Sequence, residues 1–100
     1  MFSDSLQMMP MMAVMLEEME DKREAVAARL KRVREILRLE KKEFAERAGL
    51  SMQTYGPFEG GTRDLSLQSA KRLRKTYGLS LEFLYFGMTD DLPTRISKEL

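Results

Sequence analysis

Cationic side chains are concentrated in the middle of this chain. Residues 26–88 hold thirteen lysines and arginines against seven carboxylates, a net charge of +6, whereas residues 1–25 carry −4 and residues 89–100 carry −1. Lysine and arginine at this density can bind anionic groups such as the phosphates of nucleic acids. For any single side chain among them, a solvated helical surface is the simpler explanation. Only their concentration around a shared surface favours binding.

The chain contains no cysteine and no histidine. Thiolate nucleophiles, histidine general bases and the common zinc sites are therefore excluded, and no other pattern indicates catalysis. We expect a protein that is not an enzyme and that uses neither a cofactor nor a metal. The absence of disulfides fits a reducing cytoplasm, where we expect the protein to act.

The run from Lys41 to Glu59, KKEFAERAGLSMQTYGPFE, predicts two short helices joined by a tight turn. Gly49 can end the first helix in a left-handed conformation, and Ser51 is a good N-cap for the second. The small side chain of Ala45 allows the two helices to cross closely. Apolar residues recur at helical spacing on both sides of the turn: Phe44, Ala45 and Ala48 before it, Tyr55 and Phe58 after it. Together these features indicate a helix-turn-helix unit.

Helix start and stop signals predict further helices around this unit. We expect one helix over 25–38, one capped by Ser66 that ends at Gly78, and one capped by Ser80 that ends before Gly87. The additional apolar residues expected in the core are Leu30, Val33, Ile36, Leu37, Leu67, Ala70, Leu73, Tyr77, Leu81, Leu84 and Tyr85.

The spacing of apolar residues and the start and stop signals indicate helices throughout, so we expect an all-α protein with a five-helix domain over residues 25–88. One hundred residues suffice for one such domain. Residues 89–100 form a C-terminal tail in which a short amphipathic helix after Pro93 would place Leu92, Ile96 and Leu100 on one face. That helix could pack on the domain or on a second subunit.

The N-terminal segment, residues 1–24, is acidic and rich in methionine, with seven of the nine methionines in residues 1–21. Its apolar run is too short to span a bilayer and acidic residues follow directly, so we expect neither a signal peptide nor a membrane anchor. Met12, Leu16 and Met19 continue the apolar spacing of the helix over 25–38. They could form a dimer contact or bind a partner protein, because methionine adapts to varied surfaces. A leader from an early start codon is the alternative.

From about residue 26 to residue 87 the chain resembles, without a gap, the Cro/repressor (XRE-type) helix-turn-helix family of phage and bacterial regulators. The resemblance is carried by Leu39, by FAERAGLS over 44–51, by YGPFEGG over 55–61 and by SLQSAKRLRKTYGLSLEFL over 66–84. It implies a repressor-like all-α domain that binds double-stranded DNA and regulates transcription. It also implies a homodimer on a palindromic operator.

In the family, the start of the second helix of the motif meets base edges in the major groove. Carried over to this chain, that role falls to Met52 and Gln53. The amide of Gln53 can pair with adenine, whereas Met52 offers only an apolar contact. The residues implied to bind phosphates are Lys41, Lys42, Ser51, Thr62 and Arg63. An ordinary polar surface and helix cap remains the alternative for Gln53 and Ser51.

Gly56 and Pro57 depart from the family pattern, because they stand where its members usually carry polar residues that face the groove. In a regular helix Pro57 costs roughly 3 kcal/mol and Gly56 about 1 kcal/mol, so we expect the helix to kink or stop near Tyr55.

Two alternative functions are compatible with this departure from the family pattern. Either a truncated helix reads DNA, with Pro57 against a thymine methyl group, or the protein acts mainly by binding another protein, as an antitoxin-like or phage-control partner, with weak or lost DNA binding.

Arg34 and Glu59 match an arginine and a glutamate that pair beneath the surface in the family. Both fall on helix faces that are otherwise apolar, so we expect a partly buried structural ion pair.

Overall fold

The computed structural model describes residues 22–100, and this part of the chain is all-helical, without a strand. The all-α fold predicted from the sequence is therefore confirmed. The expected N-terminal helix, with Met12, Leu16 and Met19, lies outside the described residues. The helices are α2 (Arg23–Ile36), α3 (Lys41–Arg47), α4 (Met52–Glu59), α5 (Leu67–Tyr77), α6 (Leu81–Phe86) and α7 (Thr94–Ser97).

Three of these helices begin at a serine whose hydroxyl accepts a hydrogen bond from the backbone N–H three residues later. Such a bond satisfies one of the amides that have no partner within the helix. The donors lie 3.0 to 3.1 Å away and are Thr54 for Ser51, Ser69 for Ser66, and Phe83 for Ser80.

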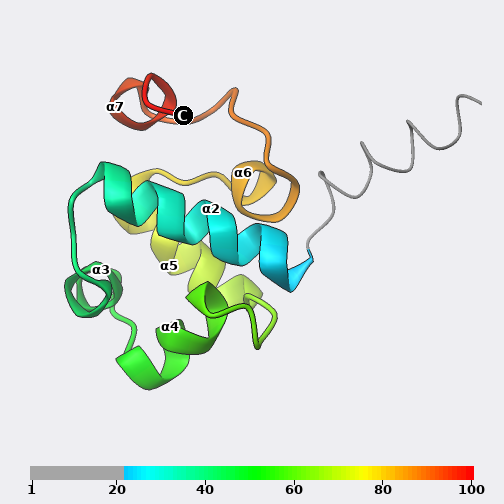
Figure 1. The fold of residues 1–100 in the computed structure, drawn as a ribbon. Helices are drawn as coiled ribbons and strands as arrows, with labels where there is room; N and C mark the ends of the chain where they lie inside the picture. The colour runs from blue at the N-terminus through cyan, green and yellow to red at the C-terminus, as the bar shows by residue number, and fades with distance from the viewer. Residues whose placement is uncertain (1–21) are drawn as a thin grey trace, which may run out of the picture.

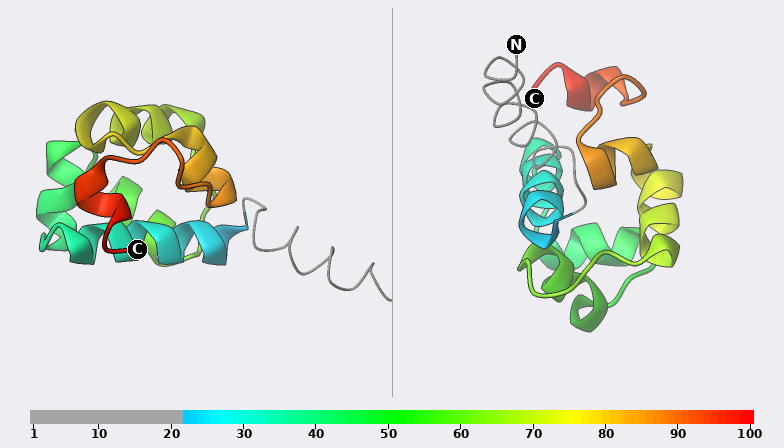
Figure 2. Two further views of the ribbon diagram at one scale, coloured as in Figure 1. Left: turned by 90° about the horizontal axis from the view of Figure 1, so that it is seen from above. Right: turned by 90° about the vertical axis from the view of Figure 1, so that its right-hand side faces the viewer.

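The helices enclose one core, with α2 and α5 on opposite sides of it and α7 across the top (Figures 1 and 2). α2 packs against α4 and α6, α3 packs against α4, and α5 packs against α6. The ring of Phe44 lies at the centre, stacked on Tyr77 at 4.4 Å and tilted against Tyr55 at 5.3 Å. The Tyr77 hydroxyl donates to the carbonyl of Phe44 at 2.7 Å, so its polar end is satisfied as well.

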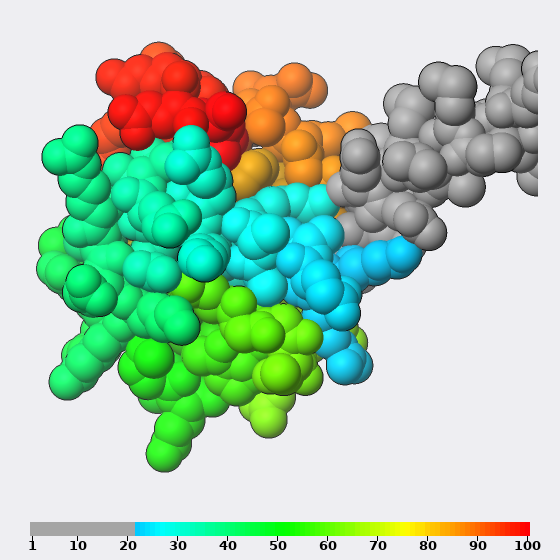
Figure 3. Space-filling view, in the orientation of Figure 1, coloured from blue at the N-terminus to red at the C-terminus, as the bar shows by residue number. Residues whose placement is uncertain are grey.

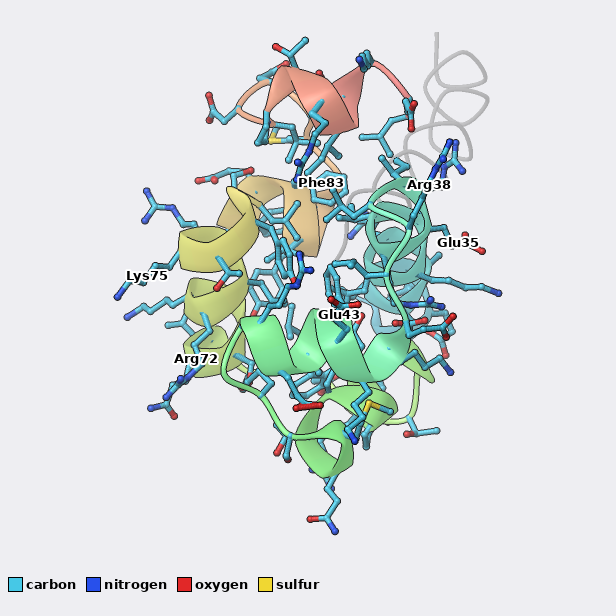
Figure 4. The ribbon with its side chains drawn as sticks, turned by 90° about the vertical axis from the view of Figure 1, so that its left-hand side faces the viewer. Glu35, Arg38, Glu43, Arg72, Lys75 and Phe83 are labelled. Atoms are coloured by element: carbon cyan, nitrogen blue, oxygen red, sulfur yellow. The ribbon has the colours of Figure 1, made fainter. Side chains whose placement is uncertain are left out.

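One assignment to the core was wrong, and some core residues were missed. Leu67 was expected inside and is 53% exposed. At about 100° per residue it lies roughly 90° around α5 from the stripe of Ala70, Leu73 and Tyr77, which faces the core. Phe83 was not expected inside and is 3% exposed. It joins the same apolar cluster as Leu92 and Ile96, in the space between α6 and α7 (Figure 4).

The C-terminal residues pack on the domain itself. Leu92 and Ile96 are 9% and 1% exposed, whereas Leu100, the third residue of the predicted stripe, is 47% exposed. Nη2 of Arg32 on α2 donates to the carbonyl of Glu99 at 2.7 Å. The space-filling view shows α7, in red, lying directly against the end of α2 (Figure 3). None of the described helices is long and apolar enough to cross a lipid bilayer.

Candidate nucleic-acid interface

The turn between α3 and α4 has the tight geometry that the sequence predicts. Gly49 adopts a left-handed φ of 74°. Its N–H donates to the carbonyl of Glu46, and the N–H of Leu50 donates to that of Ala45, both at 2.9 Å. This pair of bonds is the Schellman ending of a helix, which favours glycine at its left-handed position. Ala45 is fully buried, so α3 and α4 approach closely.

α4 has one face in the core and one face open to solvent. Tyr55, Phe58 and Glu59 are 0%, 3% and 8% exposed. On the other face Gln53 is exposed, and Met52 is 38% exposed. The start of the helix is therefore accessible while its position and rotation are set by its buried face.

Of the kink or stop expected near Tyr55, the stop was wrong, because α4 continues through Pro57 to Glu59. Pro57 removes only one backbone hydrogen bond, the one that its own nitrogen would donate to Gln53. Later bonds are intact, since the N–H of Gly60 donates to the carbonyl of Gly56 at 2.8 Å. Burial of Phe58 against the core favours the helical course by about 1.5–3 kcal/mol, which offsets most of the cost of proline.

Gly56 and Pro57 are half-buried residues of α4. The space beside Gly56 is open, since no atom lies within 4 Å of where a Cβ would stand, apart from its two chain neighbours and the backbone of its own helix. This part of α4 therefore presents backbone and a proline ring, without a polar side chain.

Glu59 holds the other end of α4 in place. It accepts hydrogen bonds from Arg34 of α2, with 2.8 Å between Nη2 and Oε1, and from the hydroxyl of Tyr55 at 2.6 Å. Nη1 of Arg34 also donates to the carbonyl of Leu39 at 3.0 Å. The pair formed by Arg34 and Glu59 thus joins α4, α2 and the turn before α3.

The remaining residues proposed from the sequence flank α4. Lys41 and Lys42 are exposed in the first turn of α3, and Thr62 and Arg63 are exposed in the loop after α4. That loop is tied back to α4, because the backbone N–H groups of Thr62 and Arg63 both donate to the carbonyl of Pro57, at 3.0 and 3.3 Å. The hydroxyl of Ser51 is engaged in capping, since it accepts from the Thr54 N–H and donates to the Thr54 hydroxyl.

Sequence reasoning missed a second group of cations beside the turn. Arg47, Arg72 and Lys75 line an open hollow together with Ala48, Gly49 and Thr76. Nη1 of Arg72 lies 2.8 Å from where a Cβ of Gly49 would stand, so its guanidinium covers the turn. Figure 4 shows Arg72 and Lys75 pointing outward from α5. The signal was the run KRLRK at 71–75 on a helix without a carboxylate, which places four positive charges on α5.

Residues that could hold a metal ion do not gather in the described part of the chain, where no group of three or more carboxylates has suitable geometry. Its charged surface is suited to binding anions, through the cations of α3, the loop after α4, and α5.

A tight glycine turn between two helices, with the second helix open at its start, defines a helix-turn-helix protein. A family model described as helix-turn-helix matches residues 30–84, more than half of the chain. The chain therefore belongs to the XRE-type helix-turn-helix family. This places it among DNA-binding regulators, a family whose members are typically not enzymes. Searches of curated proteins and of solved structures gave no match.

Proposed function

We propose that this protein is a sequence-specific transcriptional regulator of the repressor type, which acts in the cytoplasm and reads DNA with the start of α4. The observation that carries the proposal is the position of Gln53. It is exposed in the first turn of a helix whose opposite face is locked in the core by Tyr55 and Phe58. A side chain on so rigid a base can be held in register with base edges in the major groove.

The chemistry of readout follows from the side chains at this end of α4. The Gln53 amide can donate to N7 and accept from N6 of one adenine, and Met52 can contact a thymine methyl group. The open surface at Gly56 lets the α4 backbone approach the DNA closely, and the ring of Pro57 offers a second apolar contact. We therefore expect a short recognition sequence per half-site, rich in A and T at the positions that α4 meets.

Phosphate contacts would position the domain on the duplex without specifying sequence. Lys41 and Lys42 stand on one side of α4, and Thr62 and Arg63 on the other. Arg72, which covers the turn, is a further candidate. Each cation that neutralises a phosphate releases a counterion, so binding should weaken steeply with salt.

We further propose that the protein binds as a homodimer to a two-fold-related operator. A short half-site per domain supplies little affinity by itself, and two linked half-sites bind far more tightly. Met12, Leu16 and Met19 are the proposed dimer contact. Sedimentation of the full chain and of a chain lacking residues 1–20 tests this contact, and a full-length protein that is monomeric at high micromolar concentration would contradict it.

Selection of bound sequences from a random duplex library, followed by titration of the selected duplex, tests the DNA-reading proposal. Gln53→Ala should lose about 1–3 kcal/mol of discrimination at one base position. Gln68→Ala is the matched control, because Gln68 is an exposed glutamine at the same place in the first turn of α5. It should leave the selected sequence unchanged.

The phosphate contacts are tested by the salt dependence of affinity. Lys42→Ala should weaken binding to all duplexes alike and lower the slope of log affinity against log salt by about one unit. Lys98→Ala, at the opposite end of the molecule beside α7, should change neither the affinity nor the slope. Equal weak affinity of all these variants for every duplex would overturn the proposal.

A second candidate function is binding to another protein, with DNA binding weak or lost. It is favoured by the exposed apolar residues Phe86 and Met88, at 47% and 43%, and by the lack of a polar side chain at Gly56 and Pro57. The same selection experiment separates the two candidates, since a protein-binding regulator would enrich no sequence.

A further inference from the structure

A small cavity lies at the junction of α2, α3, α5 and α7. Its volume is about 190 Å³. Its apolar lining comes from the end of α2, the following turn, and the ring of Tyr77. The residues that line it are Ile36, Leu37, Arg38, Leu39, Arg47, Tyr77 and Arg95. Three arginines and four apolar or aromatic side chains therefore share the lining of one cavity.

Arg38 occupies a backbone position that is unfavourable for arginine. Its φ is 58°, and it is the only residue other than glycine with a positive φ among the described residues. α2 ends there with the N–H of Arg38 donating to Glu35 and that of Leu39 donating to Arg34, at 3.0 and 3.2 Å. α3 ends with the same pattern of two backbone hydrogen bonds and has Gly49 at the position that corresponds to Arg38. Glycine is the residue usually found at this left-handed position, and a strained residue that lines a cavity is a reason to look for a function.

The cations around the cavity are only partly neutralised. Nη2 of Arg47 lies 2.6 Å from Oε1 of Glu43, four residues earlier on α3. Within residues 22–100, Arg38 and Arg95 have no acidic partner. Two guanidinium groups that are far apart in the sequence but line one cavity therefore remain available for an anion, and arginine binds carboxylate and phosphate groups in a bidentate manner.

We propose that this cavity binds a small organic anion, with its carboxylate or phosphate group on Arg38 and Arg95 and its apolar body against Leu37, Leu39 and Tyr77. The volume fits one ring or a short chain, because a cavity of about 150 Å³ admits benzene. A simple inorganic anion would leave the apolar part of the lining uncovered.

The position of the cavity separates this site from α4, although Arg47 lines both the cavity and the hollow beside the turn. α7 and the end of α2 lie on the opposite side of α3 from α4, and Arg38 extends from the end of α2 on the α7 side (Figure 4). Binding of the anion therefore requires neither Gln53 nor Lys42. The proposal stands independently of how α4 reads DNA.

Calorimetric titration of the full chain with benzoate, phenyl phosphate and adipate tests the proposal. Acetate at matched ionic strength is the control for an anion without an apolar body. At least one of the three probes should bind, and acetate should bind at least about tenfold more weakly.

Two variants then locate the site. Arg38→Gly and Arg95→Gln should each weaken the bound probe by about tenfold or more. Arg38→Gly should also keep or raise the Tm, because glycine adopts the left-handed conformation without strain. Loss of binding by a variant that is at least as stable cannot come from misfolding. Lys31→Gln, an exposed cation of α2 outside the cavity, is the matched control and should bind as the unaltered chain does.

Two results would overturn the proposal. One is the absence of binding by all three probes. The other is equal affinity of the unaltered chain, Arg38→Gly and Arg95→Gln for a probe, which would indicate diffuse attraction to a cationic surface.

Discussion

Arg34 and Glu59, on different helices, form a fork in which the guanidinium Nε lies 3.0 Å from each carboxylate oxygen and Nη2 lies 2.8 Å from Oε1. Their side chains are 13% and 2% exposed. The hydrogen bond to Glu59 raises the pKa of Arg34, so the guanidinium stays charged. Because Glu59 ends α4, this pair fixes α4 against α2.

Removal of the carboxylate should therefore be costly. Glu59→Ala strands a nearly buried guanidinium and leaves the Tyr55 hydroxyl without its acceptor, so we expect a loss of about 3–5 kcal/mol in the free energy of unfolding. Glu46→Ala, at an exposed position of α3, should change it by less than about 0.5 kcal/mol. Equal urea midpoints for the two variants would contradict a stabilising pair.

Stability should fall at alkaline pH because of Tyr55. Burial, and then the hydrogen bond to Glu59, raises the pKa of Tyr55 well above its ordinary value. In the unfolded chain tyrosine ionises at about pH 10, so above that pH the folded state binds more protons than the unfolded state. The contribution of protonated Tyr55 to the free energy of unfolding is complete below pH ~10. It is lost as the pH rises further, at about 1.4 kcal/mol per pH unit.

The variant Tyr55→Phe isolates this effect. Urea unfolding at about pH 9 and pH 11 should give a shallower decline for Tyr55→Phe than for the unaltered chain. Some decline should remain, because burial also raises the pKa of Tyr77. Identical declines would show that Tyr55 ionises with the same pKa in both states.

Two glycines near the end of α4 should respond differently to alanine. Gly56 lies within the helix, but the ring of the following Pro57 crowds a Cβ there, so the gain in helix propensity is offset and Gly56→Ala should change the stability of the protein by less than about 0.5 kcal/mol. Gly61 has a φ of 74°, so Gly61→Ala should destabilise it by roughly 1 kcal/mol. Thermal unfolding of the two variants measures both effects, and a larger loss of stability for Gly56→Ala than for Gly61→Ala would contradict the left-handed conformation of Gly61.

The packing of α7 predicts a large effect from a residue near the C-terminus. Ile96 is 1% exposed and Leu100 is 47% exposed, although both belong to one predicted stripe. Ile96→Ala should cost about 2–5 kcal/mol, and Leu100→Ala should cost less than about 0.5 kcal/mol. Comparable small losses for both, measured by urea unfolding, would mean that α7 does not stabilise the domain.

The start and end of most helices could be predicted because the interactions that set them are local. Ser51, Ser66 and Ser80 each bond to an amide three residues away, and such a bond is readable from spacing alone. Gly49 likewise ends α3 through bonds within a single turn. The family pattern and the exposed start of α4 follow from these signals.

The sequence by itself thus determined the all-helical architecture, the helix-turn-helix unit and the residues that start α4, because each depends on neighbours within about one helical turn. Only the tertiary structure decided that α4 continues past Pro57, since burial of Phe58 and the bond from Arg34 to Glu59 act between helices. It also decided that Phe83 is buried and that Arg38 and Arg95 share a cavity. Both depend on where α7 packs, and no local spacing encodes that position.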